Sequence, residues 1–113
     1  MLKIYHNPQC QKSRAGLKYL LDQGLEPEII LYLKTALSEK TIETLLTKLN
    51  LKPIDIIRTQ EDYYKQNLKG KKFNDHEWIK IIVQNPKLLK RPIIEKDYKA
   101  VIGDPVTNIS KLL

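Results

Sequence analysis

With 113 residues, the chain is long enough for one domain with a hydrophobic core and too short for two. Its composition, 42% hydrophobic and 29% charged, is typical of a soluble globular protein, and its apolar runs are too short to span a membrane. The start of the chain lacks a secretory signal pattern, so we expect a cytoplasmic protein. The net charge of +7 favours anionic partners, although most basic residues are expected to form a solvated surface.

Short apolar runs and turn residues predict the elements of the first half. Residues 2–5 are predicted as a strand that ends in a turn at residues 6–8. Leucines at helical spacing then predict a helix that stops at Gly24. A second strand is predicted over residues 27–33, and Ser38 is placed to cap a second helix.

The second half is predicted as helices followed by a hairpin. Residues 53–68 are helix-prone without a clean periodicity. Asn74 with Glu77 resembles a capping pair at the start of a further helix. Residues 92–102 are predicted as a β-hairpin that turns at residues 96–97.

The last helix is expected to begin with Asp104 as its N-cap and Pro105 in the first helical position. The resulting order is β-α-β, then helices, then β-β-α. The first half requires parallel strands joined by a crossover helix, and the second half requires an antiparallel pair. The predicted fold class is therefore α/β, with a mixed sheet flanked by helices.

The single cysteine, Cys10, lies between the first strand and the first helix. Backbone N–H groups at a helix N-terminus stabilise a thiolate and also bind oxyanions. Lys12 and Arg14 add positive charge, and His6 adds more when it is protonated. Because its neighbours are polar, we predict a reactive thiolate rather than a buried, inert cysteine. A zinc site would need three or four ligands, and Cys10 has only His6 nearby, so no metal is predicted.

Ser13 stands three residues after Cys10, where dithiol redox proteins carry a second cysteine. A serine cannot form that disulfide, but its hydroxyl can donate a hydrogen bond to the thiolate. The alternative is that Ser13 is only a helix-start residue. Since the chain has no second cysteine, any redox chemistry at Cys10 must take its electrons from an external thiol.

Three segments together resemble the arsenate reductases of the glutaredoxin- and glutathione-linked type. Residues 4–14, with Cys10 inside them, resemble that family's active-site segment. Residues 90–94 resemble its Arg-Pro segment ahead of a strand, and residues 56–58 resemble the segment that bears another of its arginines. The resemblance spans nearly the whole chain.

The resemblance implies a thioredoxin-like fold formed by one domain over residues 1–113. In this fold a four-stranded mixed sheet is flanked by helices, and a helical insertion at about 35–88 separates the two halves. The resemblance also implies that the Arg91–Pro92 peptide bond is cis and that Arg91 lies beside the cysteine loop; the sequence alone shows only that an X-Pro bond is present.

The resemblance further implies a reaction. Cys10 attacks arsenate or another small oxyanion, water leaves, and glutathione then attacks the adduct with assistance from glutaredoxin, so that arsenite is released. Glutathione is an external reductant, no cofactor is bound, and the protein is expected to be a monomer. The supporting roles fall to two sets of residues, the oxyanion ligands Arg58 and Arg91 and the thiolate supports His6, Ser13 and Arg14. Arginine suits the first role because its planar fork gives two parallel hydrogen bonds.

One position departs from the family pattern. The family carries a third arginine just before a proline near the last strand, whereas Asp104 precedes Pro105 here. A carboxylate at this position would repel arsenate and remove one anion-binding group. The thiol chemistry of Cys10 does not depend on it.

Several alternatives remain open from the sequence. Asp104 favours a glutathione-dependent thiol reductase of unknown substrate. An Spx-like regulator that binds RNA polymerase would share the fold, but such proteins commonly carry Cys-x-x-Cys, and Ser13 replaces the second cysteine. Nucleic-acid binding is suggested by the charge alone, because the lysines are dispersed and no nucleic-acid motif is present. Without the resemblance, Arg58 would be interpreted as a surface helix residue and Arg91 as part of a positively charged loop.

Overall fold

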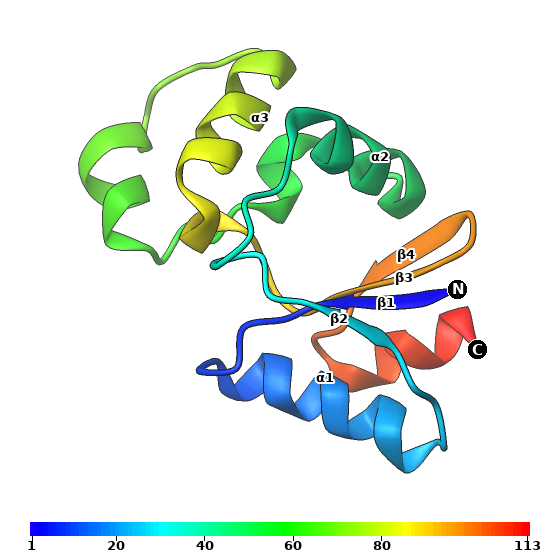
Figure 1. Cartoon of the computed structure of the whole chain (residues 1–113). Coiled ribbons are helices and arrows are strands. Elements are labelled where there is room, and N and C mark those ends of the chain that lie inside the picture. The colour runs from blue at the N-terminus through cyan, green and yellow to red at the C-terminus, as the bar shows by residue number, and fades with distance from the viewer. The chain divides into compact units, whose positions relative to one another are not determined.

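The computed structural model describes all residues, 1–113, and they form two compact units (Figure 1). The first unit combines Met1–Thr35 with Arg91–Leu113, and the second consists of Ala36–Lys90. The second unit is therefore inserted between the two parts of the first, at the position of the helical insertion predicted over about 35–88. No helix of the chain has the length and apolar character needed to cross a membrane.

The first unit is built on a mixed four-stranded sheet with strand order β2-β1-β3-β4. β1 (Leu2–Tyr5) pairs in parallel with β2 (Glu28–Ile30) and antiparallel with β3 (Ile93–Lys96). β3 pairs antiparallel with β4 (Lys99–Ile102). The parallel pair needs a crossover, which α1 (Gln11–Asp22) supplies. The predicted α/β fold class, with its β-α-β and β-β-α halves in one mixed sheet, is confirmed.

One apolar cluster holds the helices of the first unit on its sheet. Ile4 on β1 lies directly opposite Ile94 on β3, and both are 0% exposed. They pack with Leu20 of α1 and with Ile109 of the C-terminal 3₁₀ helix η4 (Val106–Leu112), so α1 and η4 lie on the same face of the sheet (Figure 1). Full burial of each such side chain contributes about 1.5–3 kcal/mol, enough for this cluster to fix both helices.

The second unit contains α2 (Glu39–Leu49) and α3 (Asp75–Gln84), and both begin as predicted. The Ser38 side chain accepts a backbone N–H of the first turn of α2. Asn74 and Glu77 form a reciprocal capping box at the start of α3, with hydrogen bonds of 2.8 and 2.9 Å. These caps satisfy N–H groups that have no partner inside their helices, which is why such residues were readable from the sequence.

The helix-prone stretch over residues 53–68 is divided into short pieces. A 3₁₀ turn, η1 (Pro53–Ile56), and a single π-helical turn, η2 (Tyr64–Leu68), are separated by non-helical residues. Between them, the N–H of Arg58 donates to the last carbonyl of the 3₁₀ turn η3 (Pro86–Leu88) at 2.7 Å. A continuous helix is thus prevented because backbone groups it would use are bonded to another segment.

Two boundaries in the first unit differ from the prediction. The strand expected over 27–33 is only β2, because the carbonyl of Leu31 accepts two turn hydrogen bonds instead of continuing the sheet. The hairpin turns one residue later than predicted, because Lys96 is still paired with Lys99. Asp97 enters the turn in the left-handed region (φ 55°), which a short polar residue tolerates.

The predicted start of the last helix was wrong. η4 begins at Val106, and Pro105 occupies the cap position with extended backbone (φ −67°, ψ 156°). Asp104 therefore precedes the cap and does not cap the helix. Its carboxylate instead forms an ion pair with Lys12 Nζ at 3.0 Å.

The close contact between Gly16 and Pro92 yields a stability prediction. A Cβ at Gly16 would lie 2.6 Å from Pro92 Cγ, an atom of a rigid ring. Alanine is the better helix former by about 1 kcal/mol, but overpacking of this kind costs about 1–3 kcal/mol. We expect Gly16→Ala to lower the free energy of unfolding in urea, whereas Lys18→Ala on the exposed face of the same helix should change it by less than about 0.5 kcal/mol. Unchanged or increased stability of Gly16→Ala would contradict the packing described here.

Candidate active site

Cys10 occupies the N-cap position of α1, with extended backbone (φ −95°, ψ 123°), and its side chain is partly exposed. Its carbonyl accepts the N–H of Arg14 at 2.9 Å, while its own N–H donates to the Asn7 carbonyl at 3.0 Å. The residue is thereby held between a tight turn and the helix. The sulfur lies where the free N–H groups of the helix start are concentrated.

Opposing effects act on the ionisation of Cys10. Burial raises the pKa of the thiol, but hydrogen bonds from the Arg91 side chain and from the N–H groups of Ser13 and Lys12, with the charge of Arg91, outweigh it, so the pKa is lower than usual. A lowered pKa matters because the thiolate is the nucleophilic form.

The segment that carries Arg91 is fixed directly on α1. The Arg91–Pro92 peptide bond is cis, and Pro92 is buried. The carbonyl of Pro92 accepts the N–H of Gly103 at 2.8 Å, and its ring lies against Gly16 of α1. The helix that begins at Cys10 and the segment that begins at Arg91 therefore have little freedom to separate.

The Ser13 side chain organises the loop, and the predicted hydrogen bond from its hydroxyl to the thiolate stays a prediction. Ser13 is 0% exposed, and its hydroxyl accepts the N–H of Asn7 at 2.9 Å and shares a hydrogen bond of 2.7 Å with His6 Nδ1. The backbone N–H of Ser13 also donates a hydrogen bond that lowers the pKa of Cys10. The alternative prediction, that Ser13 is a residue of the helix start, describes its position in the first turn of α1.

His6 and Arg14 also act on the loop. Burial and the nearby Arg14 charge lower the pKa of His6, although a hydrogen bond at Ser13 partly offsets them, so the neutral form of His6 is favoured. The neutral form adds no positive charge beside the sulfur. Arg14 Nη1 donates to the carbonyl of Pro8 at 3.0 Å, which fixes the turn that precedes Cys10.

Asn7 is a residue whose importance was not predicted beyond a turn signal. Its carbonyl accepts the Cys10 N–H, its N–H donates to Ser13, and its side-chain oxygen accepts the N–H of Gln9 at 3.0 Å. The last of these is the Asx-type turn that Asn favours. The Asn-Pro pair in the sequence is the signal that could have assigned this role.

Arg58 belongs to the second unit. Its Nε donates to a carboxylate oxygen of Glu61 at 3.1 Å, and 16% of its side chain is exposed. A guanidinium presents five N–H donors, and this ion pair uses the Nε donor. The assignment of Arg58 as an oxyanion ligand stays a prediction.

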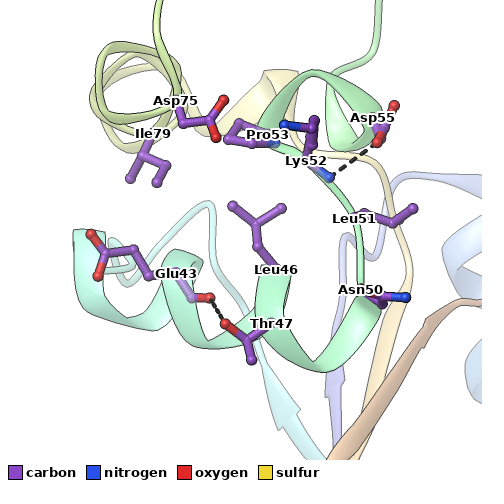
Figure 2. A pocket seen from close by; sticks show the side chains of 10 residues that line it. All are labelled: Glu43, Leu46, Thr47, Asn50, Leu51, Lys52, Pro53, Asp55, Asp75 and Ile79. Atoms are coloured by element: carbon purple, nitrogen blue, oxygen red, sulfur yellow. Dashed lines mark hydrogen bonds between the residues drawn. The ribbon is translucent and has the colours of Figure 1, made fainter.

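The second unit also contains an open groove of about 660 Å³ (Figure 2). Its apolar lining includes Leu46 and Ile79, and its rim includes the carboxylates of Asp55 and Asp75. Asp55 accepts the N–H of Lys52, and Asp75 lies in the first turn of α3, so both have roles at helix ends. The groove contains none of the predicted site residues, and no group of three or more His, Cys, Asp or Glu side chains in the chain could hold a metal ion.

The chain is similar in sequence and in fold to known proteins. The model of the ArsC family matches residues 5–112. An arsenate reductase of Neisseria meningitidis serogroup A is 34% identical over 99% of this chain and 97% of that protein. The Escherichia coli K12 protein named "Uncharacterized protein YfgD" is 40% identical over 99% of this chain and 96% of that protein. Among solved structures, an arsenate reductase from Vibrio cholerae has a TM-score of 0.93 and 34% identity, covering 99% of this chain and 97% of its own.

The matched residues include the whole cysteine loop and the Arg91 segment. Sequence and fold therefore agree over nearly the full length, and the resemblance that carried the sequence analysis is confirmed. The chain belongs to the ArsC family.

Proposed function

We propose that this protein is an arsenate reductase that uses the Cys10 thiolate as its nucleophile and an external thiol as its reductant. The observation that carries the proposal is the placement of Cys10 beside Arg91, with a pKa that is lowered despite burial. A guanidinium in this position stabilises the thiolate before the reaction and an incoming oxyanion during it. Relatives named arsenate reductase support arsenate as the oxyanion.

The first step forms a sulfur–arsenic bond. The Cys10 thiolate attacks hydrogen arsenate and one arsenic–oxygen bond breaks. The leaving oxygen keeps the proton it carries on the oxyanion, takes up a second proton from solvent and departs as water. The arsenic remains in its +5 state, so no electrons are transferred yet. Arg91 neutralises part of the charge on the remaining oxygens, and a role of Arg58 in this step stays a prediction.

The second step transfers electrons. A glutathione thiol attacks the Cys10 sulfur, a disulfide forms between the two, and the sulfur–arsenic bond breaks with its electron pair left on arsenic, which departs as arsenite. A second thiol, from glutaredoxin or another glutathione, reduces this mixed disulfide and restores Cys10. The chain supplies one cysteine only, so both electrons come from these external thiols.

A second function is favoured by the Asp104 carboxylate. It pairs with Lys12 at 3.0 Å, next to the helix start that carries Cys10. A negative charge there opposes the approach of an oxyanion but not of a neutral disulfide. A glutathione-dependent thiol reductase is therefore the alternative. The cytoplasmic location and the monomeric state stay predictions in either case.

Turnover of arsenate tests the proposal directly. With glutathione, glutaredoxin, glutathione reductase and NADPH, we expect arsenate-dependent NADPH oxidation by the wild type and its loss, by at least about a thousandfold, in Cys10→Ser, because the nucleophile is gone. Lys18→Ala, on the exposed part of α1, is the control and should retain wild-type activity. Reduction of a glutathione mixed disulfide without any turnover of arsenate would reject the proposal in favour of the thiol reductase.

The role of Arg91 is testable through the pH dependence of alkylation. The rate of reaction of Cys10 with iodoacetamide rises with pH as the thiol ionises. Because Arg91 lowers the pKa of Cys10, Arg91→Gln should raise that pKa and shift the profile to higher pH, so that the rate falls at neutral and lower pH.

The matched control for that experiment is Arg14→Gln, which removes the same charge from a residue that contacts the Pro8 carbonyl. It should shift the alkylation profile less than Arg91→Gln. Equal shifts for the two variants would mean that general charge, rather than the specific contact with Arg91, sets the ionisation of Cys10.

A further inference from the structure

The Lys12–Asp104 ion pair lies at the edge of the candidate active site and takes no part in the proposed steps. Lys12 is in the first turn of α1, and its N–H acts on the Cys10 sulfur. Asp104 directly follows Gly103, whose N–H is bonded to the carbonyl of Pro92. The pair therefore links the two segments that carry Cys10 and Arg91.

The stability of the fold does not explain this pair. The side chains of Lys12 and Asp104 are 56% and 41% exposed, and ion pairs between exposed groups contribute little to stability. The aspartate does not cap η4 either, because Pro105 holds the cap position. The remaining physical consequence of the Lys12–Asp104 pair is a change in the electrostatic potential near Cys10.

The charges around the sulfur show what that effect would be. The first turn of α1 contains no acidic residue, and the Cys10 loop and its partner segment carry the cations Lys12, Arg14 and Arg91. Asp104 cancels the charge of the first of these at contact distance. Arg91, which acts on the sulfur itself, keeps its effect on the thiolate.

We propose that Asp104 is a specificity-determining residue: paired with Lys12, it lowers the positive potential at the approach to Cys10. It thereby reduces the preference of the site for anions, and most of all for multiply charged anions, over neutral electrophiles. The thiolate itself remains activated. This inference deepens the proposed function by naming the charge class of the substrate. It rests on the proposed function only for the statement that arsenate is such an anion.

Two alkylating reagents measure this potential without any substrate. Iodoacetate and iodoacetamide both react with a thiolate by displacing iodide, and they differ in one negative charge. The ratio of their rate constants therefore reports the potential at the sulfur, while the ionised fraction and the accessibility of Cys10 largely cancel. At low ionic strength, we expect Asp104→Asn to raise the iodoacetate-to-iodoacetamide ratio about two- to fourfold.

The sign pattern across a double-mutant cycle distinguishes a charge effect from a structural one. Lys12→Gln should lower the ratio, because it leaves the carboxylate without its partner, and the Lys12→Gln/Asp104→Asn double variant should return close to the wild-type value. The matched control is Asp22→Asn, which removes the same charge from the Lys18–Asp22 pair at the other end of α1. It should leave the ratio unchanged, and every effect should decrease in 0.5 M salt, where the Debye length is only about 4 Å.

The outcomes separate this inference from the proposed function. Shifts of the same direction in both single variants, no shift in Asp104→Asn, or an equal shift in Asp22→Asn would each overturn the inference. If the ratios behave as expected, the kcat/KM for arsenate should also rise in Asp104→Asn in a protein that reduces arsenate. Expected ratios with no arsenate turnover in either protein would support the inference and reject arsenate as the substrate.

Discussion

The interaction between the Arg91 side chain and the Cys10 sulfur is the constraint on which the chemistry of this protein depends. Burial favours the protonated thiol, and the guanidinium and the amides of the helix start outweigh that effect, so that the pKa of Cys10 is lowered. Arg91 can act because Pro92 is seated against α1 at Gly16 and bonded to Gly103. The contacts of Gly16 and Gly103 with Pro92 therefore help to set the ionisation of Cys10.

The polar residues around the sulfur form two sets with separate tasks. Arg91 and the helix amides act on the sulfur, whereas Ser13, His6, Asn7 and Arg14 hold the loop that presents it. The second set is largely buried or bonded to backbone, so its contribution is positional. This division explains why a histidine whose pKa is lowered can lie in a thiolate site, because its task is the hydrogen bond to Ser13 and not a charge.

Features that arise from local chemistry were predictable from the sequence. The first strand, the caps at Ser38 and Asn74 and the position of Cys10 at a helix start all follow from residues within a few positions of one another. Partners brought together by the fold were not. His6 bonds to the Ser13 hydroxyl, and Lys12 pairs with Asp104, because the tertiary structure brings these groups within hydrogen-bonding distance. The assignment of Asp104 as a helix cap failed because Pro105 takes the cap position and η4 begins one residue later than predicted.

The first unit is discontinuous: its sheet places β1, from the beginning of the chain, beside β3, from the end. During synthesis, therefore, Cys10 leaves the ribosome long before Arg91 exists. A nascent chain carries the cysteine without the guanidinium that favours its ionisation, and its sheet cannot close until the last strands emerge. The part of the activation that comes from Arg91 therefore begins only after the Arg91 segment has been made and has joined the sheet.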